Sequence, residues 1–146
     1  MSKTTWKGGT LLAPVPVVLV SCGTVEKPAA ITIAWTGIIN SDPPRIYISV
    51  RPERNSYEII KNSWEFCVNM MPSEFVRKID YCGIKSGKNE DKLAKQKLTA
   101  LPCTQISAPQ IAQSKISLEC KVFDIIPQGS HDMFLADIVA VTLTTA

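Results

Sequence analysis

Residues 31–57 read ITIAWTGIINSDPPRIYISVRPERNSY, and this stretch decides the fold of the chain. It contains two apolar runs, at 30–35 and 45–50, in which the residues alternate with the two-residue period of a half-covered β-strand. A polar segment at 40–44 separates them, because proline lacks a backbone donor and asparagine, serine and aspartate bond their own backbone in turns. The pattern predicts two consecutive strands joined by a turn.

The second strand ends in groups that suit an anion. Successive side chains of a strand point to opposite faces, so we expect Ser49 and Arg51 on one face and Val50 on the other. A guanidinium can hold a phosphate with two parallel hydrogen bonds. The structural alternative is a solvated ion pair between Arg51 and a nearby carboxylate, Glu53 or Glu58.

The residues that follow favour a helix at 56–62. Asn55, followed three residues later by Glu58, resembles a capping box, and Tyr57 begins an apolar helical face. A helix N-terminus offers free N–H groups and partial positive charge, so the Ser56 hydroxyl and these N–H groups are candidates to hold a phosphate. Alternatively, Ser56 serves only as a helix cap.

The remaining chain alternates between short apolar runs and polar turns. A long connection at 99–113 carries two prolines, and such loops often wall a ligand site or pack on a partner subunit. The last predicted strand is apolar on both faces, which fits a dimer interface. Besides the helix above, the expected elements are strands at 17–21, 30–35, 45–50, 65–70, 115–126 and 133–143, and short helices at 73–79 and 91–98.

Composition favours one globular domain spanning 1–146. The chain has 45% apolar and 20% charged residues, and its net charge of +3 forms no basic stripe, which argues against nucleic-acid binding. The five cysteines include no C-x-x-C pair, and the single histidine leaves no multi-histidine metal centre. Composition therefore predicts no metal site, reduced thiols and a cytoplasmic protein.

The N-terminus offers an alternative localisation. The apolar run at 11–20 leads into Leu19-Val20-Ser21-Cys22, which looks like a bacterial lipoprotein cleavage site. Pro14 and Pro16 interrupt this run, which favours an irregular arm at 1–16 followed by a strand of the mature domain. No segment is long enough to cross a bilayer, so we expect no membrane association.

Four motifs in order carry a family resemblance. They are the run at 32–60, DYCGIKSG at 80–87, LEC at 118–120 and GSHDMF at 129–134. Together they resemble the flavoredoxin branch of the flavin reductase-like, FMN-binding split-barrel family, from about residue 14 to the end. The resemblance implies a mainly β fold, an FMN-binding Greek-key split barrel with a few short helices, and a homodimer. Members usually continue past the final strand, so the sequence is consistent with an incomplete C-terminus.

The resemblance also implies which residues meet the cofactor. His131 is assigned a catalytic role at the flavin ring or the nicotinamide, although this chain has Gly-Ser-His where many reductases have Gly-Asp-His. Taken alone, Trp35 suits a core or interface, Cys82 a buried thiol and His131 a turn. The expected cofactor contacts are Ala34, Trp35 and Thr36 at the ring or ribityl chain, Ser49, Val50, Arg51, Ser56 and Tyr57 at the ribityl chain or phosphate, and Cys82, Gly83, Lys85 and Ser86 in a second region.

The expected function is that of an FMN-containing oxidoreductase. FMN carries the redox chemistry, and NAD(P)H is the candidate electron donor, which would dock on the flavin face because the chain has no G-x-G-x-x-G motif. Two alternatives stay open. One is a flavoredoxin-type electron carrier without enzyme activity that serves redox protein partners, and the other is a flavin-free dimeric binding module.

Overall fold

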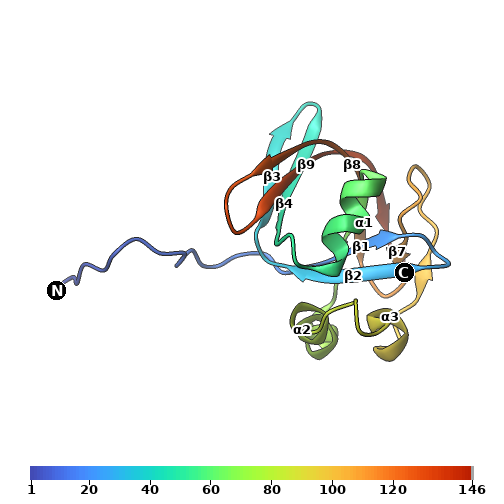
Figure 1. Ribbon diagram of the computed structural model, residues 1–146, viewed down its shortest axis with the longest axis horizontal. Coiled ribbons are helices and arrows are strands. Elements are labelled where there is room, and N and C mark those ends of the chain that lie inside the picture. Colours follow the sequence, from blue (N-terminus) through green and yellow to red (C-terminus); the bar gives the residue numbers. More distant parts are fainter. Residues whose placement is uncertain (146) are drawn as a thin grey trace.

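A computed structural model of the chain describes residues 1–145. Seven antiparallel strands form one curled sheet in the order β2-β1-β5-β8-β9-β4-β3, with α1 (Asn55–Ser63) lying across it (Figure 1). The fold is the expected mainly β split barrel. The strands of the sheet are β1 (Val18–Gly23), β2 (Pro28–Ile33), β3 (Thr36–Ser41), β4 (Pro44–Val50), β5 (Glu65–Met70), β8 (Ile116–Pro127) and β9 (Asp132–Leu143).

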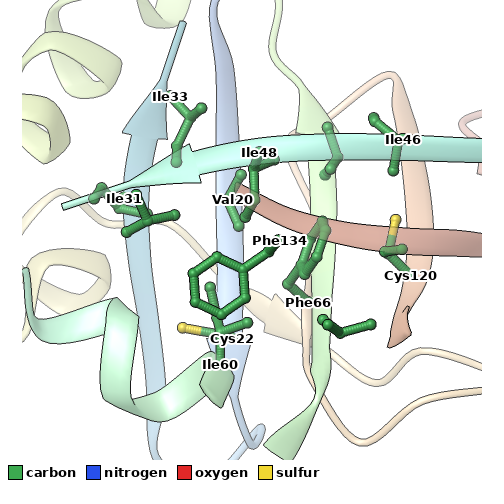
Figure 2. Packing of buried hydrophobic residues seen from close by; sticks show 14 of the residues in the cluster. Val20, Cys22, Ile31, Ile33, Ile46, Ile48, Ile60, Phe66, Cys120 and Phe134 are labelled. Atoms are coloured by element: carbon green, nitrogen blue, oxygen red, sulfur yellow. The ribbon is translucent and has the colours of Figure 1, made fainter. Parts of the chain in front are cut away.

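The barrel core forms because alternate strand residues point inward. Ile46, Ile48 and Val50 are buried on β4, as the alternation predicts. Figure 2 shows Phe66 and Phe134 packed among aliphatic side chains from facing strands, and both are fully buried. Burying such a side chain stabilises the fold by roughly 1.5–3 kcal/mol.

The two edge strands of the sheet, β2 and β3, are consecutive in the chain. Only Ala34 and Trp35 separate them, and the Ser49 N–H donates to the Trp35 carbonyl at 3.0 Å. We call the region where β2 approaches the end of β4 the seam. The strand predicted at 30–35 corresponds to β2, whereas β3, which pairs with β4 across the proline-containing turn, is absent from the prediction.

Two helices differ from the prediction close to candidate site residues, α1 at its N-terminus and α2 at its C-terminus. Helix α1 (Asn55–Ser63) begins at Asn55, and its N-cap residue Arg54 makes no side-chain cap bond, so the predicted capping box is wrong. Helix α2 (Val76–Ile84), preceded by the 3₁₀ turn η1 (Ser73–Phe75), runs past residue 79. Cys82 and Gly83 therefore lie on a helix, while α3 (Lys92–Lys95) is shorter than predicted.

The long connection at 99–113 contains a small two-stranded sheet of β6 (Ala100–Leu101) and β7 (Gln110–Ile111). A buried amide, Asn69 on β5, anchors it. The Asn69 Oδ1 accepts from the Ile111 N–H and the Ser117 hydroxyl, each at 2.9 Å, and its Nδ2 donates to the Leu19 carbonyl at 2.9 Å. We call residues 102–113 the strap.

A buried carboxylate, Glu119 on β8, holds the other end of the strap. It accepts hydrogen bonds from the Gln105 N–H at 2.7 Å and from the Thr104 N–H and hydroxyl. Glu119 is fully buried, and backbone donors compensate its desolvation. These hydrogen bonds hold the strap against the outer face of the barrel.

The N-terminal segment extends away from the barrel as an arm (Figure 1). Its largest apolar side chains, Trp6, Leu11 and Leu12, are each at least 75% exposed. Within residues 1–145, no helix combines the length and apolar character needed to span a membrane.

Candidate functional site

A cavity of about 310 Å³ opens at the seam. The end of β2 with Ala34 and Trp35 forms one wall, and the end of β4 from Ser49 to Arg51 forms another. Gly83 on α2 and His131, in the turn between β8 and β9, complete it. Residues far apart in the sequence thus meet where the barrel is not closed, and we call this space the seam cavity.

Two aromatic rings line one side of the seam cavity. The ring centroids of Trp35 and His131 lie 4.8 Å apart with a tilt of 42°. The His131 Nδ1 lies 2.9 Å from the Ser130 hydroxyl. Burial, and then the positive charge of Arg51, lower the pKa of His131, so its imidazole is neutral near pH 7. A flat ligand therefore meets a neutral, polarisable surface here.

The other side of the seam cavity is cationic. Arg54 reaches from the start of α1 to the end of α2, where its Nη2 donates to the Lys85 carbonyl at 3.1 Å and to the Cys82 carbonyl at 3.4 Å. Its Nε is buried and has no hydrogen-bond partner among residues 1–145. A buried unpaired donor on a cation is costly, so this atom points to a ligand.

Lys92 adds a second buried cation beside Arg54. Its Nζ donates to the Cys82 carbonyl at 2.8 Å and to the Lys85 carbonyl at 3.1 Å. Burial, and then the charge of Arg54, lower the pKa of Lys92 to about 8. In the described part of the chain, neither Arg51, Arg54 nor Lys92 forms an ion pair with a carboxylate. This excess positive charge fits a phosphate.

The backbone of α2 approaches the seam cavity closely at Gly83. A Cβ added there would lie 3.3 Å from the Cβ of Thr32 on β2. The Thr32 hydroxyl donates to the Ile79 carbonyl and fixes the helix against the strand. A side chain at this contact would require Thr32 or the helix to move by a few tenths of an ångström, so glycine suits the close approach.

A larger cavity of about 800 Å³ lies beside the seam cavity, between the β1–β2 turn, α1 and residues 87–92. Its walls carry charges of both signs, including Glu26, Lys27, Glu90 and Lys92. It has no aromatic side chain in its lining, so it offers no stacking surface for a flat ring. The seam cavity is therefore the better site for an aromatic ligand.

The structure brings seven of the predicted site residues together. All of them line the seam cavity, and their proposed contacts with a cofactor remain predictions. Thr36 lies instead in a neighbouring cavity of about 300 Å³ under the N-terminal arm, where its hydroxyl donates to the Tyr47 carbonyl at 2.7 Å. The seven are Ala34, Trp35, Ser49, Val50, Arg51, Gly83 and His131.

The other predicted residues do not line the seam cavity. Ser56 is buried with its hydroxyl against the Cys22 thiol. The Tyr57 hydroxyl donates to the Asp132 Oδ2 at 2.6 Å, which ties α1 to the start of β9. The second region, Cys82, Lys85 and Ser86, surrounds the end of α2, where the first two offer only their carbonyls to the buried cations.

Sequence reasoning missed Arg54, Lys92 and Thr32. Arg54 follows Arg51 in RPER, so the paired arginines were a usable signal. Lys92 stands in a polar stretch and looks like an ordinary surface lysine. Its burial depends on the packing of α3 against β2. In residues 1–145, no cluster of three or more histidine, cysteine or acidic residues could hold a metal ion.

Comparisons with known proteins agree on the fold. A model of the family described as "Flavin reductase like domain" matches residues 11–146. The flavoredoxin of Desulfovibrio vulgaris (Miyazaki F) is 32% identical, with a TM-score of 0.90 over 98% of this chain and 77% of that chain. A flavoredoxin from Methanosarcina acetivorans is 25% identical, with a TM-score of 0.90 over 99% of this chain and 76% of that chain.

A third similar structure is an FMN-binding protein from Thermus thermophilus with bound 1-cyclohex-2-enone. It is 17% identical, with a TM-score of 0.83 over 98% of this chain and 78% of that chain. At this identity, the likeness shows the fold alone.

Proposed function

Since the chain belongs to the flavin reductase like domain family, we propose that it binds FMN in the seam cavity and acts as an oxidoreductase. Bound there, FMN supplies the two-electron chemistry, while the protein supplies binding, orientation and electrostatics. Trp35 and His131 offer the ring a stacking surface, and Arg51 and Arg54 provide the positive charge that a phosphate requires.

One observation carries the proposal, namely the buried Nε of Arg54 without a partner. Arg54 already gives two hydrogen bonds to the end of α2, so it is held in place before any ligand arrives. A preorganised cation loses little conformational entropy on binding. Neither a helix cap nor a surface ion pair explains a guanidinium nitrogen that is left buried and unpaired.

We further propose that NADH or NADPH is the electron donor. The side chain of Trp35 is 44% exposed, so the ring wall of the seam cavity can be reached from solvent. A nicotinamide needs only to stack near the bound ring in the right orientation, and no acid or base is required from the protein. The neutral imidazole of His131 suits such a contact because it brings no charge to the ring.

The test combines binding with reduction. The purified chain is titrated with FMN and followed by its visible spectrum, and each reduced nicotinamide is then added without oxygen. We expect a yellow complex that bleaches with one or both nucleotides. Arg51→Ala should weaken FMN binding about tenfold, as expected for the loss of a charge-assisted hydrogen bond, whereas the exposed Arg77→Ala should not. A chain that takes up no FMN would contradict the proposal and favour a flavin-free binding module.

A second candidate function is that of an electron carrier, because two of the similar structures are flavoredoxins. A carrier would keep FMN through gel filtration and would exchange electrons with a redox protein partner. Its bound flavin would stay oxidised when NADH or NADPH is added anaerobically. The two functions are thus separated by the reduction experiment alone.

We also propose that the chain forms a homodimer and acts in the cytoplasm. The second half of β9 exposes three apolar side chains, Val139, Val141 and Leu143, which a second copy would cover. The five free cysteines support a reducing compartment. Sedimentation velocity tests the dimer. We expect a dimer that Val141→Lys dissociates and that Lys121→Ser, on exposed β8 surface, leaves intact, whereas a monomeric wild type would contradict it.

A further inference from the structure

The strap brings a second cysteine to a cysteine of the barrel. Cys67 lies in the middle of β5 and is fully buried, while Cys103 lies near the start of the strap and is partly buried. The two side chains pack together in one small cluster with Ile106 and Ala108. No sequence signal predicts this pairing, because the two residues are far apart and belong to no cysteine motif.

The strand geometry decides which thiols can pair. Phe66 and Val68 belong to the barrel core, so Cys67 between them points to the opposite face, under the strap. Cys120 is also near Cys103, but its side chain belongs to the barrel core, beside Phe66 in Figure 2. The sheet therefore stands between Cys103 and Cys120, whereas Cys103 and Cys67 share one face of it.

The strap holds Cys103 in this position. Thr104, the next residue, donates both its N–H and its hydroxyl to the buried carboxylate of Glu119. On the barrel side, the Cys67 thiol lies 3.7 Å from the Asn69 Oδ1. Both cysteines are thus fixed by hydrogen-bonded neighbours, and a pair of thiols held in contact needs little rearrangement to form a bond.

We propose that Cys67 and Cys103 form a redox-active dithiol that a peroxide converts to an intrachain disulfide. The Cys103 sulfur attacks the peroxide, the O–O bond breaks, and Cys103 becomes a sulfenic acid as one water leaves. The Cys67 sulfur then displaces the hydroxyl of the sulfenic acid, which leaves as a second water with the Cys67 proton. Two thiols lose two electrons and two protons, and one hydrogen peroxide is reduced to two waters.

The order of the two steps follows from the environments of the thiols. Cys103 is the more accessible of the pair, so it meets the oxidant first. Contact with Cys103, and then burial, raise the pKa of the Cys67 thiol far above its ordinary range. Because Cys67 is fully buried beside Cys103, we assign it as the resolving thiol, which reacts only after its neighbour is oxidised. This role does not depend on the proposed flavin site.

The test is peptide mapping of the full chain. The reduced protein is treated with limiting hydrogen peroxide, its remaining thiols are alkylated, and the digest is analysed by mass spectrometry without reduction. We expect the loss of two of the five thiols and one linked peptide pair that joins Cys67 to Cys103. Dithiothreitol should restore both thiols.

The control variants separate this pair from the other cysteines. Cys103→Ser, at a partly buried position, should abolish the linked peptides and leave Cys67 reduced. Cys82→Ala, on α2 and outside the cluster that holds Cys67 and Cys103, should leave the linked pair unchanged. A stable sulfenic acid on Cys103 with free Cys67, a Cys103–Cys120 link, or a link between two chains would each overturn the proposal.

Discussion

Buried polar groups are fully hydrogen-bonded beneath the strap, whereas one at the seam cavity lacks a partner. Beneath the strap, the amide of Asn69 and the carboxylate of Glu119 are fully buried, and every polar atom of both side chains has a partner. At the seam, Arg54 keeps a buried Nε that has none among residues 1–145. The same barrel thus has one surface closed by its own chain and another left open for a ligand.

The difference teaches how to separate structure from function in this molecule. A buried network in which every donor and acceptor is paired stabilises the fold. Breaking it leaves buried polar groups that bond neither to the protein nor to water. An unsaturated buried cation destabilises the free protein and contributes favourably only when a ligand pairs with it. Mutations beneath the strap should therefore lower stability, and mutations at the seam should lower FMN affinity.

The largest effect should come from Asn69→Ala. The change removes four hydrogen bonds of 2.9 Å that join β5 to β1, β7 and β8, and leaves their partners buried. We expect a loss of about 3 kcal/mol in the free energy of unfolding, measured with urea. A loss below about 1 kcal/mol would show that water replaces the amide and that the strap is not closed as described.

Arg54→Met should lower the affinity for FMN much more than it lowers the stability. The methionine stem keeps the packing, while the cation that faces the proposed phosphate is lost. We expect FMN binding to weaken about thirtyfold, or about 2 kcal/mol, with less than about 1 kcal/mol lost from the free energy of unfolding. Arg77→Met, on the exposed face of α2, serves as the control. A stability loss equal to that of Asn69→Ala would make Arg54 a structural cap and remove the contrast.

A smaller effect is expected for Tyr57→Phe, which removes the bond to Asp132 beside the seam. It should cost about 1 kcal/mol of stability near pH 7. The hydrogen bond to Asp132 raises the pKa of Tyr57 from 10.0 to about 12, so the phenol is held neutral in the folded state. The stability advantage over Tyr57→Phe should be complete below pH 10 and vanish as pH rises towards about 12. An advantage that persists unchanged above pH 12 would contradict the bond.

The smallest effect concerns His131, whose imidazole should titrate below its ordinary pKa of 6.5. A single histidine makes the measurement direct, because its ring resonances can be followed by NMR as pH is lowered. Since the nearby charge of Arg51 contributes to the shift, Arg51→Ala should raise the pKa of His131 towards 6.5. An unchanged titration would place the two side chains farther apart than the seam cavity requires.

Most strands of the large sheet could be predicted from the sequence because their signals are local, whereas β3 and the short strands β6 and β7 were missed. The alternation at 45–50 identifies β4 and its inward face, and the prolines at Pro43 and Pro44 mark the turn before it. The family resemblance named Trp35, Arg51 and His131, which the structure brings together although they lie on separate elements.

The remaining features depend on contacts between distant parts of the chain. Helix α2 continues through Gly83, whose backbone lies close to Thr32 on β2. No local sequence rule predicts that contact. Glu119 looks like a surface carboxylate on an alternating strand until the strap covers it. Lys92 likewise becomes buried only when α3 packs against the barrel. The sequence that flanks these residues is ordinary, so only tertiary contacts determine that they are buried.

The two-residue link between β2 and β3 has a mechanical consequence. Because Ala34 and Trp35 alone join β2 to β3, the Cα atoms of Ile33 and Thr36 cannot separate by more than about 10 Å, even with the link fully extended. Any widening of the barrel between β2 and β3 must therefore pivot about this link and increase towards the start of β2 at Pro28. The indole of Trp35 belongs to this link and also lines the seam cavity. A signal from this side chain would therefore report both on a bound ligand and on the angle of the opening.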